Sequence, residues 1–225
     1  MIKLAIFDCD GTLVDSGGSI HAALSDAFSS HGRAVPPRSE ARRVVGLSLQ
    51  EAMAALAPEA EQREHAALAD TYRDVFVGMR ARGCVEEPLF PGIAELLDTL
   101  EADGWLLAVA TGKSDRGLRH CLDSHGLHGR FVSLHTADRH PSKPAPAMAL
   151  AAMAEVGATP EHSVVIGDTA WDMGMARAAG AGAIGVLWGY HEQAELLSGG
   201  AQALAAAPGE VSDLAVQLIG GGRHG

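Results

Sequence analysis

Short apolar segments that end at polar residues constrain the fold of this chain more than any other feature. The first segment, Ile2–Phe7, runs directly into Asp8 and Asp10. Continuous apolar runs of this length are typical of strands that are buried on both faces of a parallel sheet. Four later segments have the same character, although the second of them is the least apolar: Trp105–Ala110, Phe131–His135, Ser163–Ile166 and Ala183–Trp188.

Helical patterns lie between these predicted strands. The apolar residues from Ile93 to Leu100 recur with the spacing of one helix face. Three further segments also have helical patterns: Leu118–His125, Ala147–Val156 and Met173–Ala179. Strands that alternate with helices form right-handed crossovers around a parallel sheet. We therefore predict an α/β fold with helices on both faces of the sheet.

One long stretch, from Ser19 to about Gly83, is helical in pattern and contains no convincing strand. Turn-rich sequences flank this stretch on both sides, at Asp15–Gly18 and Glu86–Gly92, as is typical of linkers. We predict an α/β core formed by residues 1–14 and 88–225, and an inserted all-helical cap formed by residues 15–87. The end of the chain, residues 220–225, is expected to fray.

Charge and cysteine content exclude several classes of protein. The net charge is −11 and there is no basic block, which argues against nucleic acid or an anionic membrane as a partner. No apolar stretch approaches the roughly 20 residues of a membrane span. The three cysteines are too few and too widely spaced for a disulfide framework. We expect a cytoplasmic protein that is a monomer or a homodimer.

Polar residues lie just beyond the predicted strands, where open parallel sheets bind their ligands. They form four sites along the chain: Asp8 with Asp10, Thr111, Lys143, and Asp168 with Asp172. Carboxylate oxygens are suitable ligands for Mg²⁺. A lysine ammonium, a threonine hydroxyl and free backbone N–H groups can donate to phosphate oxygens. This inventory favours phosphoryl transfer.

The same residues resemble the four motifs of the haloacid dehalogenase-like superfamily. Asp8–Ser16 resembles the first motif, although Cys9 replaces the more usual apolar residue. Thr111 resembles the second motif, Lys143-Pro144 the third and Gly167–Asp172 the fourth. The helical insert is similar to the small cap of the subfamily that contains phosphoglycolate phosphatases. The resemblance implies a Rossmann-like parallel core that carries this inserted cap.

The resemblance also implies roles for the acidic residues. Asp8 would be the nucleophile that accepts the phosphoryl group, and Asp10 would protonate the leaving oxygen and later activate water. Mg²⁺ would be held by Asp8, by Asp168 and by the backbone carbonyl of Asp10. Asp172 would not bind the metal directly but would contact the waters of the metal or Lys143.

Two further sites would hold the phosphate and the rest of the substrate. By resemblance, Lys143 would steady Asp8 and the phosphate, while Thr111 and the N–H of Gly112 would bind phosphate oxygens. In the cap, Arg43 and Gln50 lie near a sequence that resembles the substrate-facing loop of the family. A solvated basic helix end is the alternative interpretation of this region, and both stay open.

The predicted function is a magnesium-dependent phosphatase that acts on a small phosphorylated metabolite, with phosphoglycolate as the first candidate. A phosphomutase of the beta-phosphoglucomutase type is one alternative, but its cap loop has an arginine where this chain has Leu49. A dehalogenase is disfavoured because those relatives lack the acid that corresponds to Asp10. A non-catalytic binding or regulatory protein on the same fold is the remaining alternative.

Overall fold

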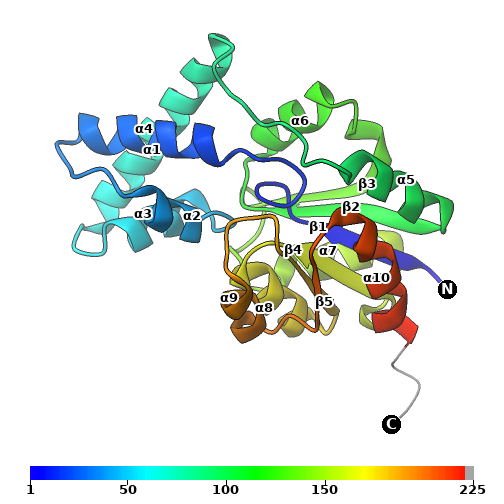
Figure 1. The fold of residues 1–225 in the computed structure, drawn as a ribbon. Helices are drawn as coiled ribbons and strands as arrows, with labels where there is room; N and C mark the ends of the chain where they lie inside the picture. The colour runs from blue at the N-terminus through cyan, green and yellow to red at the C-terminus, as the bar shows by residue number, and fades with distance from the viewer. Residues whose placement is uncertain (221–225) are drawn as a thin grey trace.

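A six-stranded parallel sheet forms the centre of the computed structural model, which describes residues 1–220 (Figure 1). The strand order is β3-β2-β1-β4-β5-β6, and every neighbouring pair is parallel. The strands are β1 (Lys3–Phe7), β2 (Trp105–Thr111), β3 (Phe131–Thr136), β4 (Ser163–Gly167), β5 (Gly182–Val186) and β6 (Ala203–Ala205). The predicted fold class is confirmed, and all five predicted strands are present.

Helices cover both faces of the sheet, which explains why its strands are apolar throughout. Leu4 and Ile6 of β1 pack towards α7 (Ala147–Val156) and α8 (Ala170–Ala179). The alternating residues Ala5 and Phe7 belong to the opposite cluster. That second cluster includes residues of three helices: α5 (Ile93–Ala102), α6 (Asp115–Ser124) and α10 (Val211–Gly220).

Four consecutive helices without a strand between them lie together on one side of the sheet, away from the N-terminus (Figure 1). They are α1 (Gly17–Ser30), α2 (Arg38–Arg43), α3 (Leu49–Leu56) and α4 (Gln62–Ala81). A separate cluster of buried apolar residues, including Leu24, Phe28 and Met53, holds these helices together. Because this cluster is distinct from the two beside the sheet, the cap has a core of its own.

The two connections between cap and sheet run side by side. Val14 and Leu89 form an isolated antiparallel bridge. Asp15 donates its backbone N–H to Pro88, and Phe90 donates its N–H to Leu13, at N···O distances of 2.9 and 3.0 Å. These pairings tie the entry and exit of the cap to each other, next to the end of β1.

The C-terminal part of the fold was not predicted. The sequence patterns predict no strand at β6 and no helix at α9 (Gln193–Gly199) or α10. β6 is only Ala-Leu-Ala, and its pairing with β5 rather than its own strand propensity determines its conformation. The expected fraying and the last five residues of the predicted core, 221–225, lie outside the described residues, while Gly220 ends α10.

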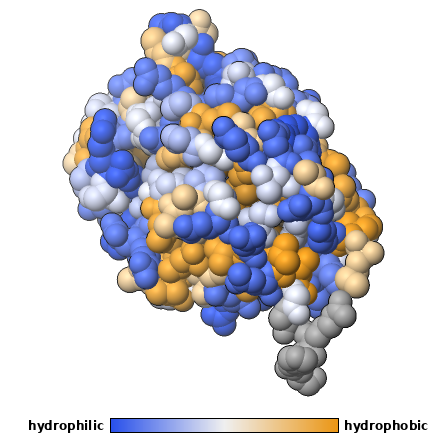
Figure 2. Space-filling model, turned by 45° about the vertical axis from the view of Figure 1, so that its right-hand side comes forward, coloured by the Kyte–Doolittle hydropathy of each residue, from blue (hydrophilic) through white to orange (hydrophobic). Residues whose placement is uncertain are grey.

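Membrane-spanning helices have a characteristic length and apolar composition. None of the helices within residues 1–220 combines the length and the apolar character needed to cross a membrane. On the face shown in Figure 2, small hydrophobic patches are separated by hydrophilic residues. Exposed large apolar side chains include Leu187, Leu197 and Val216.

Candidate active site

Asp8 lies immediately after β1 and is almost completely buried. Its Oδ1 atom accepts hydrogen bonds from the Lys143 ammonium at 2.9 Å and from the Cys9 backbone N–H at 2.6 Å. Its Oδ2 atom is buried and has no hydrogen-bond partner. Burial raises the pKa of Asp8 to about 7, although Lys143 opposes this shift. The side chain therefore has one oxygen fixed in place and one oxygen available to react or to bind a cation.

Lys143 is completely buried between two carboxylates. Its ammonium lies 2.9 Å from Asp8 Oδ1 and 2.6 Å from Asp172 Oδ1. Burial alone would lower the pKa of Lys143, but the carboxylates of Asp172 and Asp8 raise it above its usual value. The lysine is thus held as a cation beside Asp8, where a phosphate oxygen would also need positive charge.

Asp172 lies in the first turn of α8 and has two functions in the structure. Its Oδ2 atom accepts hydrogen bonds from the Thr169 N–H and hydroxyl at 3.1 and 2.6 Å, and this closes a capping box. Its Oδ1 atom pairs with Lys143. Asp172 therefore caps the helix and orients the lysine with the same side chain.

Asp168 follows β4 and is fixed by hydrogen bonds to both carboxylate oxygens. Thr12 Oγ1 donates to Oδ1, and the Tyr190 backbone N–H donates to Oδ2, both at 2.9 Å. Gly11, at φ +83°, packs so closely that a Cβ there would lie 2.1 Å from Asp168 Oδ2. Burial and the neighbouring carboxylates of Asp8 and Asp172 raise the pKa of Asp168 well above its ordinary value.

These side chains form a cluster that fits a small divalent cation. Oxygens of Asp8, Asp168 and Asp172 all lie within 4.8 Å of one another. One ammonium, from Lys143, faces three buried carboxylates, and a divalent cation would neutralise the remaining charge. Within residues 1–220, Asp8 has one oxygen without a hydrogen-bond partner, and no cationic side chain pairs with Asp168. Asp172 is already engaged by the Lys143 ammonium and by two hydrogen bonds to its Oδ2 atom, so Asp8 and Asp168 are the better side-chain ligands. An all-oxygen set of this kind suits Mg²⁺.

Asp10 lies outside this cluster and lines a pocket between the cap and the sheet. The Ser16 hydroxyl and the Lys113 ammonium both contact Asp10 Oδ1, the latter at 2.8 Å. Lys113 also lies 2.6 Å from Glu87 Oε1, and Arg80 lies 2.8 Å from Glu87 Oε2. This buried network connects Asp10 to the last turn of α4 and to the segment that leaves the cap.

The sequence analysis assigned no role to Lys113, Glu87 or Arg80. Lys113 could have been found, since it stands two residues after Thr111 in the loop that follows β2. Glu87 carried no comparable signal because it lies in a linker and reaches Asp10 only through Lys113.

Thr111 and Gly112 lie where the cap touches the sheet. Thr111 is buried at the end of β2, and its hydroxyl accepts a hydrogen bond from the Lys113 N–H at 3.2 Å. A Cβ on Gly112 would lie 2.4 Å from the Leu47 carbonyl oxygen and 2.8 Å from that of Gly46. Only glycine therefore allows the 44–48 loop of the cap to approach β2 this closely.

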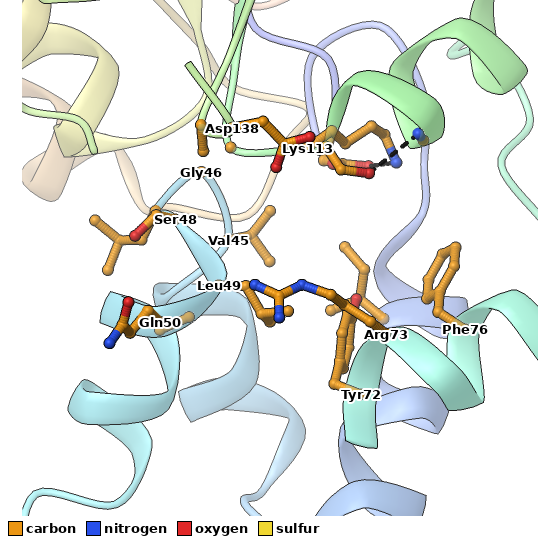
Figure 3. A pocket seen from close by; sticks show the side chains of 18 of the residues that line it. Val45, Gly46, Ser48, Leu49, Gln50, Tyr72, Arg73, Phe76, Lys113 and Asp138 are labelled. Carbon is orange, nitrogen blue, oxygen red and sulfur yellow. Dashed lines mark hydrogen bonds and ion pairs between the residues drawn. The ribbon is translucent and has the colours of Figure 1, made fainter. Parts of the chain in front are cut away.

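The two cap residues predicted to bind substrate lie in different surroundings. Gln50 lines the pocket, which has a volume of about 820 Å³ (Figure 3). Arg43 is not among the lining residues. Its guanidinium pairs with Glu195 at 2.5 Å, and its carbonyl accepts a hydrogen bond from the Trp171 indole N–H at 3.1 Å. The structure thus places Arg43 in a contact between cap and core.

Fold and site together define a class of protein: an α/β enzyme whose acidic, lysine-containing site lies at the carboxyl ends of parallel strands, beside a helical cap. Sequence comparison identifies the family within this class. The sequence model of haloacid dehalogenase-like hydrolases matches residues 2–180, and the chain belongs to this family.

Several relatives have described activities. The probable phosphatase IndB of Dickeya dadantii is 36% identical over 225 residues, which cover 97% of this chain and 96% of that protein. A phosphoglycolate phosphatase of Pseudomonas putida is 30% identical, with 84% of this chain and 71% of that protein covered. Tyrosine-protein kinase PtkA of Mycobacterium tuberculosis is 35% identical over 84% of this chain, which spans 63% of the kinase.

A solved structure agrees in both fold and sequence. A haloacid dehalogenase-like hydrolase from Streptococcus pneumoniae superposes with a TM-score of 0.82 at 28% identity, covering 95% of this chain and 98% of that one. Together with the phosphatase relatives, this match identifies the chain as a phosphoglycolate phosphatase-like hydrolase of phosphoric monoesters.

Proposed function

We propose that this chain hydrolyses the phosphate monoester of a small metabolite through an aspartyl-phosphate on Asp8, with Mg²⁺ as cofactor. The observation that carries this proposal is the state of the Asp8 carboxylate. Lys143 fixes one oxygen, while the other is buried without a hydrogen-bond partner. A buried carboxylate oxygen without a protein hydrogen-bond partner is a suitable nucleophile, because no hydrogen bond to the protein must break before it attacks.

The first half of the reaction transfers the phosphoryl group to the protein. Asp8 Oδ2 forms a bond to phosphorus as the bond from phosphorus to the alcohol oxygen breaks. Asp10, which lines the pocket, gives its proton to the departing oxygen. Lys143 stabilises the negative charge on the phosphate oxygens. When bound, Mg²⁺ supplies further positive charge that offsets the repulsion between carboxylate and phosphate.

The second half of the reaction releases phosphate. Asp10, now ionised, takes a proton from a water molecule as that water attacks phosphorus. The bond between phosphorus and Asp8 Oδ2 breaks, and inorganic phosphate leaves with Asp8 restored as a carboxylate. Asp10 has regained its proton and is ready for the next substrate.

The residues that would hold Mg²⁺ are Asp8 and Asp168 through their side chains and Asp10 through its backbone carbonyl. The charge balance of the cluster, with one ammonium facing three buried carboxylates, supports this assignment. We further propose a small phosphorylated metabolite, rather than nucleic acid or membrane, as the partner, since the net charge is −11. A phosphomutase is disfavoured because the apolar Leu49 lines the pocket.

The direct test is the Asp8→Asn variant, assayed with a generic ester such as p-nitrophenyl phosphate in the presence of Mg²⁺. Turnover should fall at least about a thousand-fold, because an amide cannot serve as the nucleophile. Asp26→Asn is the matched control, since Asp26 is exposed on α1. Near-normal turnover by the pure Asp8→Asn protein would exclude the proposed covalent step.

A further inference from the structure

The pocket beside Asp10 is large for the alcohol part of phosphoglycolate. It has a volume of about 820 Å³, within the range of pockets that enclose drug-sized ligands, whereas glycolate has only two carbons. On the basis of the proposed function, we propose that the substrate is the phosphate monoester of an extended, apolar alcohol. The apolar part of this alcohol would occupy the cap side of the pocket.

Apolar side chains of three cap helices form that side of the pocket. Ile20 comes from α1, Leu49 from α3, and Tyr72 and Phe76 from α4. All four line the cavity and are only partly buried, and Figure 3 shows Leu49, Tyr72 and Phe76 at the pocket. The Tyr72 and Phe76 rings lie together, with centroids 5.7 Å apart and planes inclined by 32°. A concave apolar surface of this kind is suited to an apolar ligand group.

Three cationic side chains that line the pocket already pair with carboxylates, which makes them poorly placed to bind a glycolate carboxylate. Lys113 already pairs with Asp10 and Glu87, and Arg80 pairs with the same glutamate. Arg73 lies 2.6 Å from Asp70 and is exposed. A second anionic group on the substrate would therefore have to compete with carboxylates that these cations already contact.

One further arginine and two histidines line the core side of the pocket. Arg116 and His120 lie on α6 and are exposed to solvent. His140 is half-buried and contacts His135 at 2.9 Å, and burial lowers the pKa of His140. These groups belong to α6 and to the loop after β3 rather than to the cap helices, so they do not change the character of the cap side.

The pocket that these apolar side chains line reaches Asp10 and the cap loop beside Asp8. Asp10, Gly46 and Gly112 line the same pocket as Tyr72 and Phe76. A Cβ on Gly46 would lie 3.7 Å from Asp8 Oδ2, which shows how closely this loop approaches the nucleophile. An ester with its phosphate at Asp8 and its bridging oxygen at Asp10 would thus extend its alcohol along the cap helices.

The test compares two esters with similar alkyl leaving groups, propyl phosphate and 3-phenylpropyl phosphate, together with 2-phosphoglycolate. The full chain is assayed with Mg²⁺. We expect kcat/KM to be at least about ten-fold higher for 3-phenylpropyl phosphate than for either other ester, since apolar groups in such pockets discriminate by this factor. Because the leaving groups match, this difference reports on binding of the phenyl group rather than on reactivity.

Variants then locate the site. Leu49→Ala and Phe76→Ala should each lower kcat/KM much more for 3-phenylpropyl phosphate than for propyl phosphate, so that most of the preference is lost. Leu197→Ala is the matched control, because Leu197 is 51% exposed on α9 and lies outside the pocket. Retention of propyl phosphate turnover shows that each variant is folded.

Three results would overturn the proposal. Equal kcat/KM for the two alkyl esters, or a higher value for 2-phosphoglycolate, would contradict an apolar alcohol while leaving the phosphatase activity intact. An unchanged preference in both pocket variants would place the phenyl group elsewhere. Failure to hydrolyse any ester, including p-nitrophenyl phosphate, would remove both this proposal and the proposed function.

Discussion

At the scale of single residues, the buried ammonium of Lys143 balances charges that would otherwise be uncompensated. It is fully buried and contacts both Asp8 and Asp172. Removing one partner of a buried ion pair typically costs about 3–5 kcal/mol, because it leaves an unpaired buried charge. The same residue therefore contributes to stability and, in the proposed mechanism, to phosphate binding.

We predict that Lys143→Met lowers the free energy of unfolding by about 3 kcal/mol and abolishes turnover. Urea denaturation would measure the stability, with Mg²⁺ omitted. Added Mg²⁺ should recover part of the loss, because it would neutralise the same carboxylates. A variant as stable as the wild type without metal would show that these carboxylates are not charged in the folded protein.

Glu87 provides a second test at the scale of single residues, through the pH dependence of the stability of the protein. Burial alone would raise its pKa, but Lys113 and Arg80 lower it below the ordinary value of 4.5. A depressed pKa in the folded protein adds stability above the unfolded pKa, and this stability is lost as pH falls through the folded pKa. The stabilising effect of Glu87 should therefore be present at neutral pH and disappear in acid.

We predict that Glu87→Gln is less stable than the wild type at pH 7 by about 2–3 kcal/mol, and that this difference shrinks as pH falls below 4.5. The free energy of unfolding of both proteins, measured at several pH values, would give this difference in stability. Glu86→Gln, at the neighbouring position, is the control. A difference that stays constant down to strongly acidic pH would mean that Glu87 does not pair as a carboxylate.

At the scale of elements, the contact between the cap loop and the end of β2 depends on Gly112. We predict that Gly112→Ala lowers kcat/KM by about a hundred-fold, since displacing a loop by about 1 Å in an active site can have this effect. Gly129→Ala is the control, because no atom lies within 4 Å of the Cβ that it would add. Full activity of Gly112→Ala would show that this close contact is unnecessary for turnover.

Arg43 and Gln50 provide another comparison between elements. Arg43 pairs with Glu195 at the surface, where such pairs contribute only about 0–1 kcal/mol, whereas Gln50 lines the pocket. We predict that Arg43→Ala changes KM equally for all esters, while Gln50→Ala changes KM differently for propyl and 3-phenylpropyl phosphate. Steady-state kinetics with both esters would decide, and a substrate-dependent effect of Arg43→Ala would contradict this placement.

The strands and the polar motifs that follow them could be predicted from the sequence, because both have local signals. β1, β2 and β4 are apolar on both faces and end at polar residues, so each strand and the residue after it could be predicted together. The contact of Glu87 with Lys113 could not be predicted, because it depends on the path of the linker that leads from the cap back to the sheet. The strand β6 could not be predicted either, because its pairing with β5 determines its conformation.

At the scale of the whole molecule, the insert and the sheet contribute different parts of the site. The sheet carries Asp8, Lys143 and Asp168, whereas the cap supplies the apolar side of the pocket. In the proposed mechanism, the chemistry is thus assigned to the sheet with its two hydrophobic clusters, and substrate selection to the cap with a third. This separation explains why the sequence motifs identify the reaction class but not the alcohol that is released.

The central claim is that Asp8 itself carries the phosphoryl group, and phosphopeptide mapping after acid quench tests it most directly. Asp10→Asn should slow hydrolysis of the intermediate, so this variant is mixed with p-nitrophenyl phosphate and Mg²⁺, then digested for mass spectrometry. We predict one phosphoryl group on Asp8, and none when Asp8→Asn is added to the same variant. A phosphoryl group on another residue, or rapid release of p-nitrophenol with no phosphorylated peptide, would contradict the account.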